Sequence, residues 1–265
     1  MRITGVIGYP LKQTYSPLLH NTAFNSLKID GIYYPMCVQP TDFGTIISSL
    51  KTLGITGVNI TNPYKEEVLK YLDDIDEQTN SIGAVNTILI KANKIIGFNT
   101  DFYGFEKSLS EHNIDLSDKT VLLIGAGGVA RACAFVLKDV GVKKLFVTNR
   151  TINKTEKIIS ICKAEAIGFA QIRQIAKYVD VVINATSIDL QNKIIPALKS
   201  GGIYYDTNYR FKQIRRRGIF VVNGICMLIY QAAHSFSLWT GKEPPVSIMK
   251  CALRGVFNDK DAHIG

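Results

Sequence analysis

The sequence has no long apolar run, and its few cysteines form no recognisable pattern. No stretch approaches the roughly 18 apolar residues that a membrane-spanning helix needs. Residues 1–10 alternate like a strand and lack the charged start and apolar centre of a secretion signal, so we expect a cytoplasmic protein without a membrane partner. The odd number and wide spacing of the five cysteines argue against a disulfide framework or a zinc site. We expect no metal, and we interpret as buried thiols Cys37, Cys133, Cys162, Cys226 and Cys251.

Acidic residues are fewer than basic ones, 22 against 31, which gives a formal charge of +9. Such a charge can serve a nucleic acid, an anionic membrane or an anionic small ligand. The dense basic cluster at 212–217 (KQIRRR) lacks the interleaved aromatic residues of a single-strand binder. We therefore interpret it as a solvated loop and expect no nucleic-acid partner.

The length of 265 residues leaves room for one large domain or two ordinary ones, and 46% hydrophobic residues suffice for a core in each. Strand and helix patterns alternate along the first hundred residues. Predicted strands cover 2–8, 32–38 and 54–61. Predicted helices start at Ser16-Pro17, with serine as the N-cap, after 41–42, and at Pro63. This order predicts a mainly parallel sheet, with a hairpin following over 84–98.

The alternation of strands and helices restarts after a polar segment that ends near residue 119. Predicted strands cover 120–125, 145–150, 179–186 and 202–208. An amphipathic helix at 225–239 needs a partner for its apolar side, so we expect the C-terminal segment to return to the first domain. The sequence thus predicts an α/β protein of two domains, residues 1–103 with 229–265 and residues 104–228.

A glycine-rich turn follows the apolar strand at 120–125 and precedes a helix. It reads Gly125, Ala126, Gly127, Gly128, Val129 and Ala130. In that context Gly125 permits a tight turn, Gly127 allows the backbone close to a pyrophosphate at the helix N-terminus, and Ala130 lets the helix pack against the sheet. A plain βα turn is the alternative, but strand, turn and helix together indicate dinucleotide binding.

The end of the next strand bears on which nicotinamide cofactor is used. Binders of NAD carry an acid about 20 residues after the glycines, on the ribose 2′-hydroxyl. Here Asn149, Arg150 and Thr151 stand in its place, with Lys154 one turn further on. A guanidinium there would pair with a 2′-phosphate, although a solvated loop arginine is the alternative. The pattern favours NADP.

A second group of polar residues follows strands or begins helices in the first domain, the edge at which open parallel sheets bind ligands. It consists of Thr14, Ser16, Asn59, Thr61, Lys65, Asn86, Asn99 and Asp101. The hydroxyls of Thr14 and Ser16 could hold a carboxylate or simply cap a helix, and the two roles are compatible. Lys65 and Asp101 are ordinary residue types, and their shared position after strands of one sheet marks the pair as a candidate acid/base.

These segments together resemble the shikimate dehydrogenase family over essentially the full length. The resemblance is carried by 5–24, 57–68, 82–87, 97–105, 122–132, 148–151, 183–187 and 227–233. It implies NADP-linked interconversion of 3-dehydroshikimate and shikimate, a step of chorismate and aromatic amino-acid biosynthesis. It also implies that residues 1–103 with 229–265 bind the substrate and that residues 104–228 form a Rossmann-type cofactor domain, in a monomer or homodimer.

The resemblance also implies roles for individual residues. Lys65 matches the acid/base, paired with Asp101. Matches to substrate-binding positions are Thr14, Ser16, Thr61, Asn86, Gln231 and Tyr209. Beyond the glycine turn and residues 149–154, matches to cofactor-binding positions are Thr186, Ser187, Gly224, Met227 and Glu77.

Three positions depart from the family's pattern. Threonine replaces the usual serine at Thr14, Ile188–Leu190 replace a small residue and glycine, and Arg210-Phe211 replaces Asn-Pro after Tyr209. A quinate or dual quinate/shikimate dehydrogenase is therefore one alternative. A catalytically silent NADP-binding regulatory module is another, although such a module has no physical need for both Lys65 and Asp101.

Overall fold

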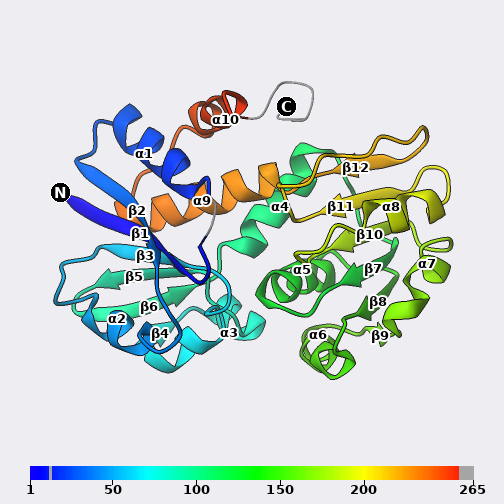
Figure 1. Ribbon diagram of the computed structural model, residues 1–265, viewed down its shortest axis with the longest axis horizontal. Helices are drawn as coiled ribbons and strands as arrows, with labels where there is room; N and C mark the ends of the chain where they lie inside the picture. The colour runs from blue at the N-terminus through cyan, green and yellow to red at the C-terminus, as the bar shows by residue number, and fades with distance from the viewer. Residues whose placement is uncertain (12–13, 257–265) are drawn as a thin grey trace. The chain divides into compact units, whose positions relative to one another are not determined.

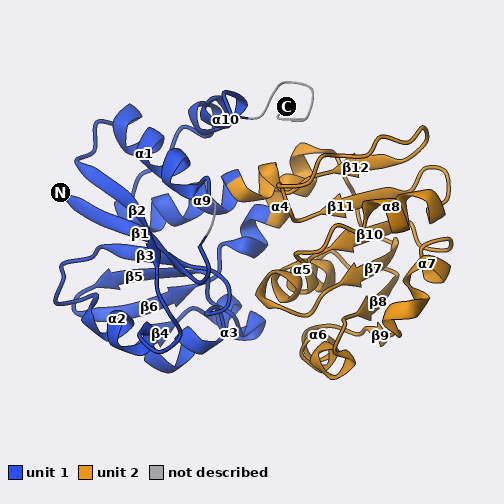
Figure 2. Cartoon of the chain, viewed as in Figure 1, with its two compact units in different colours: residues 1–104, 229–258 blue, residues 105–228, 259–265 orange. Residues whose placement is uncertain are grey.

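The computed structural model describes residues 1–11 and 14–256 (Figure 1). The chain forms two compact units: unit 1 contains Met1–Gly104 and the segment from Ile229 on, and unit 2 contains Phe105–Leu228 (Figure 2). The boundaries fall within two helices, α4 (Asp101–Glu111) and α9 (Ile225–Thr240). Among the described residues, no helix combines the length and hydropathy needed to cross a membrane.

Unit 1 is built on a six-stranded sheet in the order β2-β1-β3-β5-β6-β4. Its strands are β1 (Arg2–Gly8), β2 (Gly31–Cys37), β3 (Gly57–Ile60), β4 (Asp74–Ile75), β5 (Thr87–Lys91) and β6 (Lys94–Phe98). Strand β1 pairs in parallel with β2 and β3, whereas β5 runs antiparallel to β3 and β6. Because β5 is reversed, it begins at the edge of the sheet where β1 and β3 end. The expected hairpin turns at Ala92 and Asn93, which both have positive φ.

The helices of unit 1 correct two sequence-based expectations. The helices are α1 (Ser16–Ser26), α2 (Phe43–Ser49), α3 (Glu77–Ile82) and α10 (Val246–Arg254), with the end of α9. Ser16 is not the N-cap but the first residue of α1, which has Tyr15 at the cap and Pro17 in its first turn. The helix predicted from Pro63 is only a 3₁₀ turn, η1 (Glu67–Tyr71). The Lys65 carbonyl accepts from the Val85 N–H instead of from its own next turn, so a tertiary bond replaces a helical one.

The sheet of unit 1 is covered on both faces (Figure 1). On one face, Phe43 and Ile47 of α2 pack over Ile7, Val58 and Ile88. On the other face, α1 and α9 enclose aromatic rings in contact with one another, contributed by His20, Phe24, Tyr33, Phe236 and Trp239. The Trp239 indole N–H donates to the Ile88 carbonyl at 2.8 Å, which ties α9 to the sheet.

His20 is fully buried in this aromatic cluster, with its ring stacked on Tyr33 at 4.2 Å. Burial lowers the pKa of His20 to about 3 from 6.5. The unfolded chain therefore takes up this proton first as the pH falls, and acid lowers the free energy of unfolding. The stability that His20 contributes is fully present above pH 6.5 and is lost as the pH falls toward about 3.

Replacing His20 with phenylalanine should flatten the dependence of stability on pH. The variant keeps a planar ring against Tyr33 and removes the proton, so the loss of roughly 3 kcal/mol that His20 causes between pH 7 and pH 4 should disappear. Urea unfolding of both proteins across this pH range measures the difference. Other titrating groups are common to both proteins, so parallel curves for the two would contradict the assignment.

Unit 2 is built on an all-parallel sheet in the order β12-β11-β10-β7-β8-β9. The strands are β7 (Thr120–Ile124), β8 (Lys144–Thr148), β9 (Glu165–Ala166), β10 (Val181–Asn184), β11 (Ile203–Asp206) and β12 (Phe220–Val222). The helices include α5 (Gly128–Asp139), α6 (Glu156–Ile161), α7 (Ile172–Ile175) and α8 (Gln191–Ile194), with the 3₁₀ turns η2 (Ile152–Thr155), η3 (Phe169–Gln171) and η4 (Ile195–Ala197). This is the strand order of a Rossmann-type fold, with its first strand, β7, at the switch point.

The exposure of the cysteines departs from expectation. Cys133, Cys162 and Cys226 are buried, but Cys37 and Cys251 are exposed, so the expectation of five buried thiols is wrong for these two. Cys37 is the last residue of β2, and Cys251 lies on α10, whose buried side chains include Met249 and Leu253. An apolar stretch of sequence therefore does not indicate which of its residues face the core and which face the surface.

Candidate functional site

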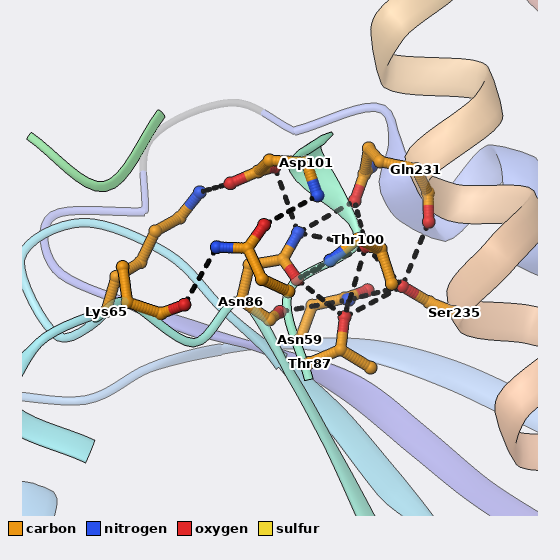
Figure 3. Close-up of polar contacts among 10 residues, drawn as sticks. Asn59, Lys65, Asn86, Thr87, Thr100, Asp101, Gln231 and Ser235 are labelled. Carbon is orange, nitrogen blue, oxygen red and sulfur yellow. Dashed lines mark hydrogen bonds and ion pairs between the residues drawn. The ribbon is translucent and has the colours of Figure 1, made fainter. Parts of the chain in front are cut away.

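Lys65 and Asp101 form an ion pair at the carboxyl edge of the unit 1 sheet (Figure 3). The Lys65 Nζ lies 2.5 Å from Asp101 Oδ2, and the two side chains are 16% and 8% exposed. Lys65 follows β3 and Asp101 begins α4, so 36 residues of chain separate them. The ammonium is thus reachable from solvent while its carboxylate partner is nearly covered.

Asn86 holds the other oxygen of Asp101. Its Nδ2 donates to Asp101 Oδ1 at 2.9 Å, and its Oδ1 accepts from the Thr100 backbone N–H at 2.7 Å. The Gln231 Oε1 lies 3.5 Å from the same Nδ2, so α9 contributes to this group. Because β5 is antiparallel, Asn86 precedes its strand at the edge where Lys65 follows β3. The structure therefore brings together Lys65, Asn86, Asp101 and Gln231.

A buried layer of polar side chains lies behind these four. Ser235 Oγ lies 2.9 Å from Thr87 Oγ1 and 3.1 Å from Thr100 Oγ1. Asn59 Nδ2 donates to Thr87 Oγ1 at 2.9 Å and is 3.0 Å from Ser235 Oγ. Such a connected layer satisfies its buried polar groups internally and holds the outer side chains in place.

The other predicted substrate residues lie at different points of the chain. Thr14 and Ser16 stand at the start of α1, where the Ser16 N–H donates to Thr14 Oγ1 at 3.2 Å. Thr61 follows β3, and its backbone N–H donates to the carbonyl of Ile7 on β1 at 2.9 Å. These three belong to unit 1, whereas Tyr209 belongs to unit 2, in the segment between β11 and β12.

A lysine beside a carboxylate can serve as a proton donor in its ammonium form and as a proton acceptor in its neutral amine form. Lys65 can give a proton to an oxygen that gains negative charge and can take one from a hydroxyl. Asp101 keeps the ammonium in one place, and Asn86 keeps Asp101 in place. Hydroxyl and amide groups around the pair can hydrogen-bond a small polyhydroxylated molecule.

In unit 2 the glycine turn joins β7 to α5 with the geometry expected of its sequence. Gly125 has φ +119°, and a Cβ there would lie 2.8 Å from the Ala185 carbonyl oxygen. Gly127 is the N-cap of α5, and a Cβ there would meet nothing within 4 Å. Ala126 and Ala130 are buried, while Gly128 and Val129 are partly exposed. The turn therefore leaves open space over the N-terminus of α5, as a bound pyrophosphate requires.

The remaining predicted cofactor residues of unit 2 also follow parallel strands. Asn149, Arg150, Thr151 and Lys154 come after β8, with Asn149 Nδ2 donating to the Thr151 carbonyl at 2.9 Å and Arg150 exposed. Thr186 and Ser187 follow β10, and Thr186 Oγ1 donates to Asn184 Oδ1 at 2.7 Å. Gly224 and Met227 follow β12, where a Cβ on Gly224 would collide with the Thr207 carbonyl. Glu77 differs from the others because it is an exposed residue of α3 in unit 1.

Asp206, at the end of β11, is a buried carboxyl behind the Thr186 loop. Its Oδ2 accepts from Asn184 Nδ2 and Tyr204 Oη at 3.2 Å, and its Oδ1 accepts from the Asn208 backbone N–H at 2.9 Å. Burial raises the pKa of Asp206 to about 7, since desolvation outweighs these hydrogen bonds. Asp206 connects the segment after β10 with the segment that carries Tyr209.

Some of these polar residues could not be recognised from sequence patterns. Tyr33, Thr87, Thr100 and Ser235 read as ordinary strand, loop or helix residues, and Asp206 as the end of a strand. The one available signal was spacing, because Ser235 lies one helical turn after Gln231. Among residues 1–11 and 14–256, no group of three or more His, Cys, Asp or Glu side chains could hold a metal ion.

Comparison with known proteins agrees with this architecture. Three family models match: a shikimate dehydrogenase substrate-binding domain over residues 6–88, shikimate/quinate 5-dehydrogenase over 107–197, and a shikimate 5′-dehydrogenase C-terminal domain over 224–254. A shikimate dehydrogenase (NADP⁺) of Bacillus cereus strain AH187 is 38% identical, covering 94% of this chain and 96% of its own.

Solved structures are similar over nearly the whole chain. The Thermus thermophilus shikimate 5-dehydrogenase, solved with NADP(H) and shikimate, has a TM-score of 0.86 and 30% identity, covering 97% of this chain and 100% of its own. A Corynebacterium glutamicum quinate dehydrogenase in complex with NAD has a TM-score of 0.85 and 28% identity, covering 96% and 99%.

The fold and the two sets of strand-end residues define the class first: a two-unit α/β protein whose second unit has a Rossmann-type dinucleotide-binding fold. Within that class, the sequence similarity over nearly the whole length of the chain determines the family. The chain belongs to the shikimate dehydrogenase family.

Proposed function

We propose that this protein catalyses the NADP(H)-linked interconversion of 3-dehydroshikimate and shikimate, a step of chorismate and aromatic amino-acid biosynthesis. The observation that carries the proposal is the Lys65–Asp101 ion pair, held by Asn86 at a sheet edge rich in hydroxyl and amide groups. Reduction of a ketone leaves negative charge on its oxygen, so a donor must stand there. Lys65 supplies that proton in reduction and removes the hydroxyl proton in oxidation.

Unit 1 binds the substrate in this proposal, and unit 2 binds the cofactor. Thr14 and Ser16 take the substrate carboxylate, with Tyr209 serving the same group. Thr61, Asn86, Asp101 and Gln231 hydrogen-bond the ring hydroxyls. The family membership of the chain and the clustering of the last three residues with Lys65 support these roles.

NADP(H) fits the residues of unit 2. The open space over Gly127 and the exposed amides at the start of α5 suit a pyrophosphate, and the cation of Arg150 suits a 2′-phosphate. Asn149, Thr151 and Lys154 accompany Arg150, while Thr186, Ser187, Gly224 and Met227 line the rest of the cofactor site. Glu77 of unit 1 is an additional cofactor contact. When bound, the cofactor supplies the hydride.

Four parallel reactions test the function. Purified protein is mixed with shikimate or quinate and with NADP or NAD, and nicotinamide absorbance is followed over time. We expect turnover of shikimate with NADP. Turnover of quinate alone would replace the proposal by the quinate dehydrogenase alternative. NADP binding without turnover of either substrate would support the silent regulatory module.

Replacing Arg150 with alanine should weaken the preference for NADP over NAD. Loss of a charge-assisted bond to the 2′-phosphate should raise KM for NADP by about tenfold to a hundredfold, with KM for NAD unchanged. Initial rates at varied cofactor concentration measure both constants. Arg173 is an exposed arginine of α7, and Arg173→Ala should leave both constants unchanged. Equal loss for NADP and NAD would remove Arg150 from the 2′-phosphate site.

The wider setting follows from chemistry and charge. We place the protein in the cytoplasm, as a monomer or homodimer whose partners are its small-molecule substrates, with no nucleic acid among them. The basic run at 212–217 is exposed at Lys212 and Arg215–Arg217, and its lack of interleaved aromatic residues is what favours a solvated loop. Retention on random DNA at physiological salt would contradict the last point.

A further inference from the structure

Two buried asparagines of unit 1, Asn59 and Asn86, have side-chain amides whose orientations are set by backbone groups. Asn59 Nδ2 lies 3.2 Å from the Asn86 carbonyl oxygen, which can only accept. Asn86 Oδ1 lies 2.7 Å from the Thr100 N–H, which can only donate. Neither amide can be turned over without placing two acceptors or two donors in contact. Both orientations are therefore determined by the chain around them.

These orientations give the network a direction. Asn59 Oδ1 must accept, so the Tyr33 hydroxyl, 2.7 Å away, donates to it. Asn59 Nδ2 donates to Thr87 Oγ1 at 2.9 Å, and Thr87 Oγ1 can donate to Asn86 Oδ1 at 3.0 Å, with Ser235 Oγ at 2.9 Å as a second partner of the same hydroxyl. Asn86 Nδ2 in turn donates to Asp101 Oδ1 at 2.9 Å. The series of donors Tyr33, Asn59, Thr87 and Asn86 leads to Asp101, and Figure 3 draws the contacts among its last three members.

The series starts in a part of the unit that is well packed. The Tyr33 ring is fully buried between His20 and Trp239, at centroid distances of 4.2 Å and 5.9 Å. Asn59 itself is 6% exposed, and Thr87 is completely buried. The hydroxyl of Tyr33 is thus aimed by packing on β2, α1 and α9, at a distance from the Lys65–Asp101 pair.

We propose that Tyr33 and Asn59 are positioning residues: by donating into the network they keep the Asn86 amide in the orientation that donates to Asp101, and so hold the Asp101 carboxylate in place as the acceptor for Lys65. Without the Tyr33 hydrogen bond, Asn59 Oδ1 is a buried acceptor lacking its donor, and the amide gains by rotating toward another one. Rotation of the Asn59 amide removes its Nδ2 donor from Thr87 Oγ1. The Thr87 hydroxyl can then reorient, which weakens its hydrogen bond to Asn86 Oδ1. The inference rests on the proposed function of Lys65 and adds two residues outside its contacts.

The test compares two buried tyrosines of unit 1, Tyr33 on β2 and Tyr64 in the turn after β3. Tyr33→Phe removes the donor to Asn59, while Tyr64→Phe removes a hydroxyl that donates to the Val38 carbonyl at 2.6 Å on the other face. Both variants lose one buried hydrogen bond, so both should lose similar thermal stability. Only Tyr33→Phe should lower kcat for shikimate oxidation, by about fivefold to tenfold, with KM for shikimate within about twofold of wild type.

Asn59→Asp is the stronger variant, because an aspartate places an acceptor where Thr87 needs a donor. We expect kcat to fall about a hundredfold, again with little change in KM. If Asn59→Asp fails to fold, the tyrosine pair still decides the matter. Equal kcat losses in Tyr33→Phe and Tyr64→Phe, or losses confined to KM, would overturn the positioning role. Inactivity of the wild-type protein on shikimate would instead overturn the proposed function, so the two failures are distinguishable.

Discussion

Replacing Lys65 with alanine should lower kcat for shikimate oxidation by about a thousandfold, with a much smaller change in KM. In the proposed reaction the proton on Lys65 moves chiefly in the transition state, so loss of the side chain should affect turnover more than binding. The ion pair with Asp101, at 2.5 Å, holds the ammonium in place for this proposed transfer. Steady-state rates at saturating NADP and varied shikimate measure both constants.

Two further variants separate proton transfer from charge. Lys65→Arg keeps a cation beside Asp101 but cannot lose its proton, so it should be nearly as slow as the alanine variant. Lys51→Ala breaks another ion pair of unit 1, to Asp73 at 2.8 Å, and should leave kcat unchanged. Full activity in Lys65→Arg would show that Lys65 acts as a charge and not as the acid/base.

Replacing Gly127 with alanine should weaken NADP binding about tenfold to a hundredfold while leaving the fold nearly as stable. A Cβ at this position meets nothing within 4 Å in the protein, and the backbone conformation, with φ −80°, suits any residue. The methyl group would instead occupy the space that the pyrophosphate needs near the first turn of α5. The pyrophosphate would then lose charge-assisted hydrogen bonds from the backbone N–H groups of that turn. Fluorescence titration gives the Kd for NADP, and thermal unfolding without cofactor gives the stability.

Gly125→Ala is the matched contrast, two residues earlier in the same turn. Its φ of +119° and the Ala185 carbonyl at 2.8 Å from the added Cβ should make this variant unstable even without cofactor. A Gly127→Ala protein that binds NADP normally would show that the pyrophosphate lies elsewhere. Loss of stability in both variants alike would show that the whole turn is structural.

The alternation of strands and helices was predictable because it depends on local periodicity. Strands β7, β8, β10 and β11 of unit 2 and the hairpin turn at Ala92-Asn93 follow directly from apolar runs and turn residues, whereas the two-residue strand β9 was not predicted. The helix expected from Pro63 failed for a non-local reason. The Lys65 carbonyl is taken by the Val85 N–H, 20 positions further along the chain, and no local pattern records that competition.

The candidate site was likewise predictable where it depends on local patterns and not where it depends on contacts between distant segments. Lys65, Asn86 and Asp101 could be grouped because residues after parallel strands meet at one edge. Strand β5 runs antiparallel to β3, which brings Asn86, the residue before β5, to the edge where β3 ends. Residue types alone do not predict that β5 pairs with β3 in this direction. Tyr33 could not be recognised and Ser235 offered only its spacing from Gln231, because the role of both depends on α9 packing against β2 and β5, with 148 positions between Ser235 and Thr87.

Unit 1 is assembled from both ends of the chain, and this sets the order in which the protein can mature on the ribosome. Unit 2 is continuous, so all of it has been synthesised before Ile229 is added. The early segments that contain Lys65 and Asn86 must wait for Ser235 and Trp239, which are translated after unit 2. A chain ending prematurely near residue 228 would display the uncovered Tyr33 face, a target for chaperones and proteases rather than a slow enzyme.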